Sequence, residues 1–174
     1  MNKKKAANAA VKLRITDALF ELMKEKDISG ITITELIKRA GVARASFYRN
    51  YSSKEDILIV LIHHAFQSFL DGRTAEEIDF KNFENVVRGF ECFKKYGTYV
   101  LGLYRSNYAT VLLEELNQFH AEITGTMPAS SMDRYAINVY MGALFNTAIA
   151  WLNGGAKESC EDMAKFFMER INII

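Results

Sequence analysis

Five side chains that donate hydrogen bonds occur within a short stretch, and no carboxylate interrupts them. They are Arg44, Ser46, Tyr48, Arg49 and Asn50. If the stretch is helical, Phe47 faces inward and the five donors lie on the outer face. A short helix with donors and no acid suits the groove of a polyanion, where phosphates and base edges accept hydrogen bonds. The sequence therefore predicts a surface for nucleic acid.

Two short helices joined by a tight turn are expected to hold this face in position. Thr32 is a suitable N-cap for the first helix, because its hydroxyl can accept a free backbone N–H, and Glu35 can complete a capping box. Four apolar residues then share one helical face: Ile33, Leu36, Ile37 and Ala40. Gly41 follows, where glycine readily adopts the left-handed backbone that ends a helix. The second helix is expected to start near Ala43.

The residues from Ala40 to Asp56 resemble the helix-turn-helix of TetR-type transcriptional regulators. In that family a capped helix leads into A-G-V-S, two variable residues, a small hydroxyl residue, an apolar residue, Tyr, a variable residue, His, Phe, two residues and Lys. Here the stretch reads A-G-V-A-R-A-S-F-Y-R-N-Y-S-S-K-E-D, and the similarity extends over residues 8–60. Three positions depart from the pattern: Ala43 replaces serine, Asn50 replaces histidine and Tyr51 replaces phenylalanine.

The resemblance implies that double-stranded DNA is the partner of this surface. The expected DNA-contacting residues are Thr32, Thr34, Ala43, Arg44, Ser46, Tyr48, Arg49, Asn50, Tyr51 and Lys54. Among them, Arg44 and Asn50 are expected to contact bases, and Tyr48 and Lys54 to contact phosphates. Lys54 would lie in the first turn of a long helix, where the helix dipole favours an acid. A cation at that position indicates a nearby anion, and a phosphate is the simplest candidate.

The charge distribution agrees with an anionic partner for the N-terminal part of the chain. Residues 1–54 hold 12 of the 22 Lys and Arg residues but only 5 of the 21 Asp and Glu residues. The two parts of the chain therefore carry net charges of +7 and −6, although the whole chain carries only +1. A charge that is segregated in this way predicts that the N-terminal part meets the polyanion.

Several other classes of protein are disfavoured by the sequence. The two cysteines, Cys92 and Cys160, are far apart and lack metal-ligating neighbours, and no cofactor motif occurs. No nucleophile with a base, no phosphate-binding glycine loop and no metal-ligand spacing indicates an enzyme. No secretory signal and no run of about 18 to 20 apolar residues is visible. A cytoplasmic protein without a membrane span is expected.

The hydrophobic pattern predicts an all-α fold of about nine helices. Three helices would form a DNA-binding domain over residues 1–55, and a long linker helix would join it to an effector-sensing and dimerisation domain over residues 56–174. Of the other expected helices, four are expected to be capped, by Ser53, by Asp79, by Ser130 or Ser131 and by Ser159, and the others to start near Ala7, Tyr99 and Asn107. N-cap residues followed by residues that place their apolar side chains on one helical face are typical of helices that pack around a shared core.

The last two helices are expected to form a dimer interface. The first is apolar nearly all round, so it must be covered on both sides. Two such helices from each of two chains could make a four-helix bundle around a two-fold axis, as members of the family do. The expected interface residues are Tyr135, Val139, Ala143, Met163, Phe166 and Phe167. The alternative is that this region is the core of a monomer.

The family resemblance further implies a small-molecule pocket in the C-terminal domain. Candidate lining residues are Phe90, Phe93, Tyr96, Tyr104, Phe119, Asn146 and Trp151, although residues at such spacing can equally form plain core. The chain is thus expected to be a repressor that binds palindromic operator DNA as a homodimer and responds to an effector. The alternative is a co-activator whose effector is another protein, since the W-L-N-G-G segment and the following helix loosely resemble such TetR-like proteins of low-GC Gram-positive bacteria.

Overall fold

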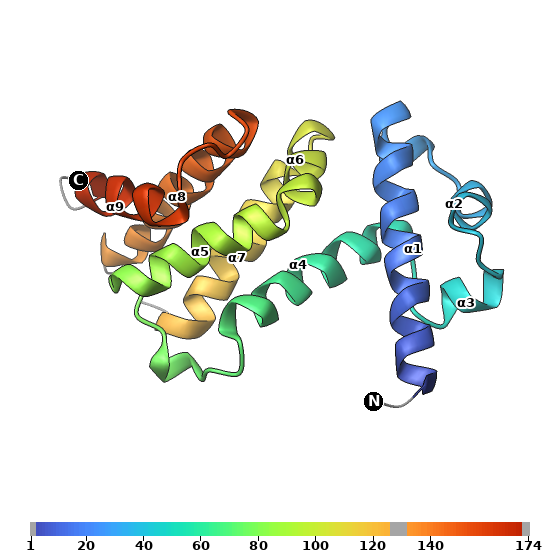
Figure 1. Ribbon diagram of the computed structural model, residues 1–174, viewed down its shortest axis with the longest axis horizontal. Coiled ribbons are helices and arrows are strands. Elements are labelled where there is room, and N and C mark those ends of the chain that lie inside the picture. Colours follow the sequence, from blue (N-terminus) through green and yellow to red (C-terminus); the bar gives the residue numbers. More distant parts are fainter. Residues whose placement is uncertain (1–2, 126–131, 172–174) are drawn as a thin grey trace. The chain divides into compact units, whose positions relative to one another are not determined.

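The computed structural model describes residues 3–125 and 132–171, which form nine α-helices and no β-strand (Figure 1). The all-α prediction is therefore confirmed. The helices are α1 (Lys3–Glu25), α2 (Ile33–Ala40), α3 (Arg44–Tyr48), α4 (Lys54–Leu70), α5 (Phe83–Lys95), α6 (Gly97–Arg105), α7 (Ala109–Thr124), α8 (Ala136–Asn153) and α9 (Cys160–Ile171). Short 3-10 turns η1 (Ile28–Gly30), η2 (Ala75–Glu77) and η3 (Met132–Tyr135) lie between them.

The chain divides into two compact units, which we call the head (residues 1–63) and the body (residues 64–174). The long helix α4 contributes its first ten residues to the head and the rest to the body. The sequence-based boundary, at residues 55 and 56, lies eight residues earlier than this division.

The head packs three helices and the start of α4 around a small apolar core. Ile15, Leu19 and Leu22 on α1 have no exposed surface, and neither do Leu36 on α2 and Phe47 on α3. The predicted cap of α2 is present, because the backbone N–H of Glu35 donates to the Thr32 hydroxyl over 3.2 Å. Burial of these aliphatic and aromatic side chains is the main term that holds such short helices together.

The turn between α2 and α3 has the backbone that its glycine predicts. Gly41 has φ 62° and ψ 41°, in the left-handed region. The N–H groups of Gly41 and Val42 donate to the carbonyls of Lys38 and Ile37 over 3.3 and 3.1 Å. This pair of bonds is a Schellman motif, which satisfies the free carbonyls at the end of α2 and turns the chain into α3.

In the body, aromatic rings connect the helices. Phe90 on α5 is fully buried, with its ring centroid 5.7 Å from that of Trp151 on α8 and 6.2 Å from that of Phe167 on α9. Figure 1 shows α9 beside α5, and these two helices are in direct contact. A second cluster joins Phe66 on α4 to Phe119 on α7, whose rings stack at 4.3 Å.

Several expected helix boundaries differ from those observed. The first helix begins at Lys3 rather than near Ala7. Asp79 does not cap α5, because the chain first makes a turn in which the N–H of Asn82 donates to the Asp79 carbonyl, and Asn82 then accepts from Glu84 and becomes the cap. The predicted cap of α9 is confirmed by the bond from the Asp162 N–H to the Ser159 hydroxyl. The cap expected at Ser130 or Ser131 lies outside the described residues.

Gly97 is the first residue of α6, and α5 ends two residues before it, at Lys95. Its lack of a side chain has a packing reason, because a Cβ atom at this position would lie 3.0 Å from Cδ2 of Leu152 on α8. The close approach of α6 and α8 therefore depends on this glycine.

Candidate nucleic-acid interface

Helix α3 places one side chain in the core of the head and leaves the others outside. Phe47 is fully buried, and its ring meets the ring of Tyr48 edge-on at 5.3 Å. Tyr48 itself is 50% exposed, and Arg44 and Arg49 are also exposed. The outer face predicted from the sequence therefore exists, with two guanidinium groups and a phenol at the surface.

Arg44 is held in place by neighbours on both short helices. Its Nη1 donates to the Thr34 hydroxyl and its Nη2 to the Tyr48 hydroxyl, both over 3.3 Å. The guanidinium carbon also lies 5.4 Å from the centroid of the Tyr48 ring. Long side chains lose rotamer entropy when they bind. The two contacts reduce that loss, because Arg44 is already ordered before any partner arrives.

Arg49 differs from Arg44 because its side chain has no neighbour that holds it. Its guanidinium makes no hydrogen bond or ion pair with any residue in the described part of the chain, and it is exposed. The other basic side chains of the head include Arg39 and Lys26, which pair with Glu25 and Glu35 at 3.0 and 2.7 Å. Arg49 is thus a cation available to an external anion.

The carboxylate of Glu35 is the one acid on α2 and α3, and it is neutralised locally. Its hydrogen bond to Lys26 is the largest cause that lowers the pKa of Glu35, and the backbone N–H of Thr32 lowers it further. Because the ammonium of Lys26 offsets its charge, Glu35 adds little repulsion toward a polyanion.

Two of the expected DNA-contacting residues are engaged inside the head. Tyr51 is 4% exposed, with its ring centroid 6.0 Å from that of Phe47. Burial raises the pKa of its phenol, and a side-chain hydrogen bond with Thr16 acts in the opposite direction. Asn50 is half-buried, and both ends of its amide bind other groups of the head, at Asn8 and Ser46. The structure therefore gives Tyr51 a core position and Asn50 a bridging position, rather than a free outward face.

Lys54 also has partners that its sequence position did not reveal. Its ammonium donates to the backbone carbonyls of Ile31 and Ser29 over 2.8 and 3.1 Å. These carbonyls flank the end of η1, so they supply the electronegative neighbour that the position of the cation indicated. These two bonds leave the third N–H group, and the Glu55 carboxylate lies 4.0 Å from the ammonium nitrogen. Asp56 and Ser53 meanwhile cap α4, because the Asp56 N–H donates to the Ser53 hydroxyl over 3.1 Å.

The remaining predicted positions lie at the starts of the two helices. Thr32, Thr34 and Ala43 are exposed and Ser46 is half-buried. Ala43 occupies the N-cap position of α3 and makes no side-chain cap, as its methyl group requires. The start of α3 is therefore held by backbone bonds alone, from Ser46 and Phe47 to the Ala43 carbonyl.

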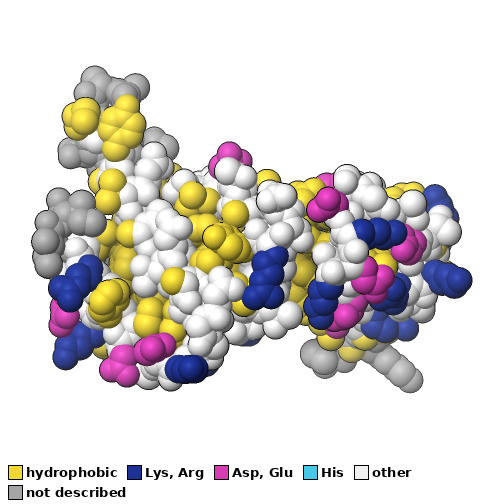
Figure 2. All heavy atoms as spheres, turned by 90° about the horizontal axis from the view of Figure 1, so that it is seen from above, with side chains coloured by type: hydrophobic (Ala, Val, Ile, Leu, Met, Phe, Trp, Pro, Cys, Tyr) yellow, Lys and Arg dark blue, Asp and Glu magenta, His cyan; other side chains and the backbone are white. Residues whose placement is uncertain are grey.

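In the body, α8 and α9 expose apolar side chains. Tyr135, Val139 and Phe166 are 45%, 46% and 50% exposed, whereas Met163 and Phe167 are buried and Ala143 is half-buried. Figure 2 shows hydrophobic side chains at the surface of the body on the face that it draws. The expected interface residues thus separate into an exposed set and a core set.

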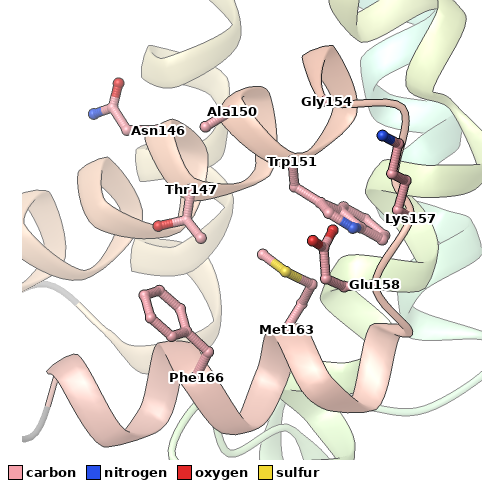
Figure 3. A pocket seen from close by; sticks show the side chains of 9 residues that line it. All are labelled: Asn146, Thr147, Ala150, Trp151, Gly154, Lys157, Glu158, Met163 and Phe166. Carbon is pink, nitrogen blue, oxygen red and sulfur yellow. The ribbon is translucent and has the colours of Figure 1, made fainter.

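An open groove of about 610 Å³ lies along the same two helices (Figure 3). Its lining comes from α8, from the loop that follows it and from α9: Asn146, Thr147, Ala150, Trp151, Gly154, Lys157, Glu158, Met163 and Phe166. Trp151 is 5% exposed, and its indole N–H has no acceptor among the described residues. The lining of the groove thus mixes apolar side chains with four polar or charged ones.

The residues proposed to line a small-molecule pocket do not surround one cavity. Asn146 and Trp151 line the open groove, while Phe90, Phe93, Tyr96 and Phe119 are at most 9% exposed and belong to the packed core. Tyr104 is 41% exposed, with its ring centroid 6.4 Å from that of Phe145. Sequence spacing therefore could not separate core positions from pocket positions.

Part of the chain matches a known protein family. Residues 15–61 match the family described as bacterial regulatory proteins, tetR family. Over 58 residues the chain is 33% identical to an uncharacterized HTH-type transcriptional regulator, YxbF, of Bacillus subtilis (strain 168). That alignment covers 33% of this chain but only 15% of YxbF, so the chain spans a small part of this curated relative's length.

Solved structures share the fold over nearly the whole chain. A TetR transcriptional regulator from Streptococcus agalactiae 2603V superposes with a TM-score of 0.63 at 23% identity and covers 97% of both chains. The dihydroxyacetone kinase operon activator DhaS superposes with a TM-score of 0.58 at 12% identity and covers 94% of both. Among the described residues, no helix has the length and apolar character needed to cross a bilayer.

Proposed function

We propose that this TetR-family regulator binds palindromic operator DNA as a homodimer, acts as a repressor in the cytoplasm and responds to an effector through its body. The observation that carries the proposal is the exposed face of α3, where Arg44 is ordered by Thr34 and Tyr48 and Arg49 has no partner among the described residues. Guanidinium groups on a short helix can donate two hydrogen bonds to guanine or bind phosphates. The acid-free face and the positive N-terminal part of the chain favour the same partner.

The proposed contacts follow the exposure of each side chain. Arg44 is assigned to base edges, and Tyr48, Arg49, Thr32 and Thr34 are assigned to the sugar-phosphate backbone. Asn50, Tyr51 and Lys54 are assigned to holding the head together, because the partners of their polar groups lie within it. This assignment narrows the set of contacts expected from the sequence.

The homodimer is supported by the unpaired apolar surface of α8 and α9. Val139 and Phe166 are about half exposed, and Phe166 also lines the open groove. Leaving such surface in water costs roughly 25 cal/mol per Å², so a second copy that covers it is favoured. A dimer also suits the head, since one five-residue helix reads few bases and two heads can read two half-sites.

Selection of duplexes from a random oligonucleotide pool by the full-length chain tests the DNA function. We expect an enriched palindrome, bound with an affinity that falls steeply as salt rises. Enrichment of no sequence, together with equal retention of all duplexes at low salt, would contradict operator binding.

Sedimentation of Val139→Glu and Phe166→Glu tests the dimer separately. Each variant places a charge on the proposed interface, so both should sediment as single copies while the parent sediments as a pair. Gln118→Glu, on the exposed surface of α7, is the matched control and should leave the parent's behaviour unchanged. A single-copy parent would contradict the dimer.

The alternative function is that of a co-activator whose effector is a protein. The observation that favours it is the packed state of Phe90, Phe93 and Phe119, which fill the interior where a small-molecule pocket was expected. DhaS, which shares the fold, is itself described as an operon activator, so the fold alone is compatible with either sign of regulation. Binding of a metabolite library, read by the shift in unfolding temperature, separates the two, because a protein-responsive regulator should show no stabilising compound.

A further inference from the structure

Helix α3 is so short that contacts with other parts of the head must hold its C-terminal end. The helix spans five residues, and isolated helices of that length do not persist in water. Phe47, the fourth residue of the helix, is fully buried and anchors the helix to the core of the head. Its last turn, which carries Tyr48 and leads to Arg49, needs a separate anchor.

The side chain of Asn50 supplies that anchor. Its Nδ2 donates to the Ser46 carbonyl over 2.8 Å, so it occupies a carbonyl of the last turn. Its Oδ1 accepts from Nδ2 of Asn8 over 2.9 Å, and Asn8 lies on α1, 42 residues earlier in the chain. The two bonds tie the end of α3 to the first part of α1.

The Ser46 carbonyl fixes the orientation of the Asn50 amide, which in turn fixes that of the Asn8 amide. A backbone carbonyl can only accept, so the NH₂ group of Asn50 must face Ser46 and its oxygen must face Asn8. Asn8 must then donate with its own NH₂ group. The cost is visible in the structure, because Oδ1 of Asn8 is buried and has no partner among the described residues. A buried acceptor without a partner is unfavourable, which argues that the position serves the bond to Asn50.

We propose that Asn8 is a positioning residue for DNA reading. It acts through Asn50 to set the direction of the last turn of α3 against α1, and thereby the directions of Tyr48 and Arg49. This inference rests on the proposed DNA-binding function. It also replaces the direct base contact that the sequence predicted for Asn50.

The test compares Asn8→Leu with Asn50→Ala and the double variant in the full-length chain. Leucine keeps the approximate shape of asparagine but cannot donate. Affinity is measured for the palindrome selected by the parent and for a scrambled duplex of the same composition. We expect Asn8→Leu to weaken binding to the palindrome about tenfold, with the scrambled duplex and the salt slope unchanged. The Asn8→Leu change should have no further effect in the Asn50→Ala background.

Amide hydrogen exchange provides a second readout that does not require DNA. Asn8→Leu should speed the exchange of the Asn50 and Tyr51 amides, which donate to the Phe47 carbonyl, and leave the amides of α2 unchanged. Gln118→Leu removes an amide side chain from an exposed position of the body and is the matched control. It should change neither readout.

The outcomes distinguish this inference from the function on which it rests. If the parent enriches no duplex, DNA binding and the positioning role both fail. If the parent binds its palindrome and Asn8→Leu binds it equally well, the positioning role alone is wrong. Additive losses in the double variant, or an equal loss on both duplexes, would also overturn it, because Asn8 would then act independently of Asn50.

Discussion

Different kinds of contact hold the helices together in the head and in the body. In the head, α2 and α3 have only 8 and 5 residues, and their ends are connected by polar bonds such as Asn8 to Asn50 and Lys54 to Ile31. In the body, α7 and α8 have 16 and 18 residues, and aromatic rings join α7 to α4 by stacking and α8 to α5 edge-on.

The difference has a physical cause. A short helix buries too few apolar side chains to fix its own direction, so hydrogen bonds from neighbouring elements set that direction. A long helix can present an apolar stripe on more than one face, so packing alone fixes it and apolar surface is left over. The head therefore offers an ordered polar face to a partner, and the body offers an apolar one.

A pair of phenylalanines gives the largest expected contrast between the two units. Phe47→Ala removes the central ring of the head core and should lower the free energy of unfolding by about 3–5 kcal/mol. Phe166→Ala removes a ring that is 50% exposed and should change the stability of a single copy by less than about 1 kcal/mol. Urea denaturation followed by circular dichroism measures both. Equal losses would show that the two rings have the same environment.

The acid sensitivity of the body should exceed that of the head because of one histidine. His120 is 8% exposed, stacked on Phe80 at 4.2 Å, and burial lowers its pKa from 6.5 to about 4. The folded state therefore prefers the neutral ring. The contribution of this neutral ring to the free energy of unfolding is complete above pH 6.5 and is lost as the pH falls toward 4. The loss amounts to at most about 3 kcal/mol.

Replacing the His120 ring should remove its part of the pH dependence of the free energy of unfolding. The free energy of unfolding of His120→Gln should fall less between pH 7 and pH 4.5 than that of the parent, while His63→Gln, at an exposed position of α4, should behave like the parent. If His120→Gln and the parent lose stability in parallel, groups other than this histidine cause the acid sensitivity.

The smallest expected effect concerns the recognition of DNA sequence rather than the stability of the fold. Arg44→Ala should reduce discrimination between the selected palindrome and its single-base variants by about 1–3 kcal/mol at the contacted base, with little change in unfolding temperature. Arg39→Ala, which removes an arginine already paired with Glu25, is the control. If Arg44→Ala discriminates between the duplexes as well as the parent does, Arg44 does not contact the bases.

Much of the fold was predictable because the signals were local. The cap at Thr32, the left-handed Gly41, and the caps at Ser53 and Ser159 each depend on residues within a few positions of one another. The resemblance to TetR-type regulators added the helix order. The cap at Asp79 was predicted wrongly, because two candidate residues three positions apart compete for one helix start and the intervening turn selects Asn82.

The sequence by itself determined which chemical groups the head could present: donors without acids, on a short helix after a glycine turn. Only the tertiary structure decided which of these donors remain free. Asn8, which binds Asn50, and Ile31, which binds Lys54, lie 42 and 23 residues away along the chain, so no local pattern could reveal these two partners. Because hydrogen-bonding groups are satisfied wherever folding brings a partner within reach, exposure and occupancy are properties of the packed head and not of its sequence pattern.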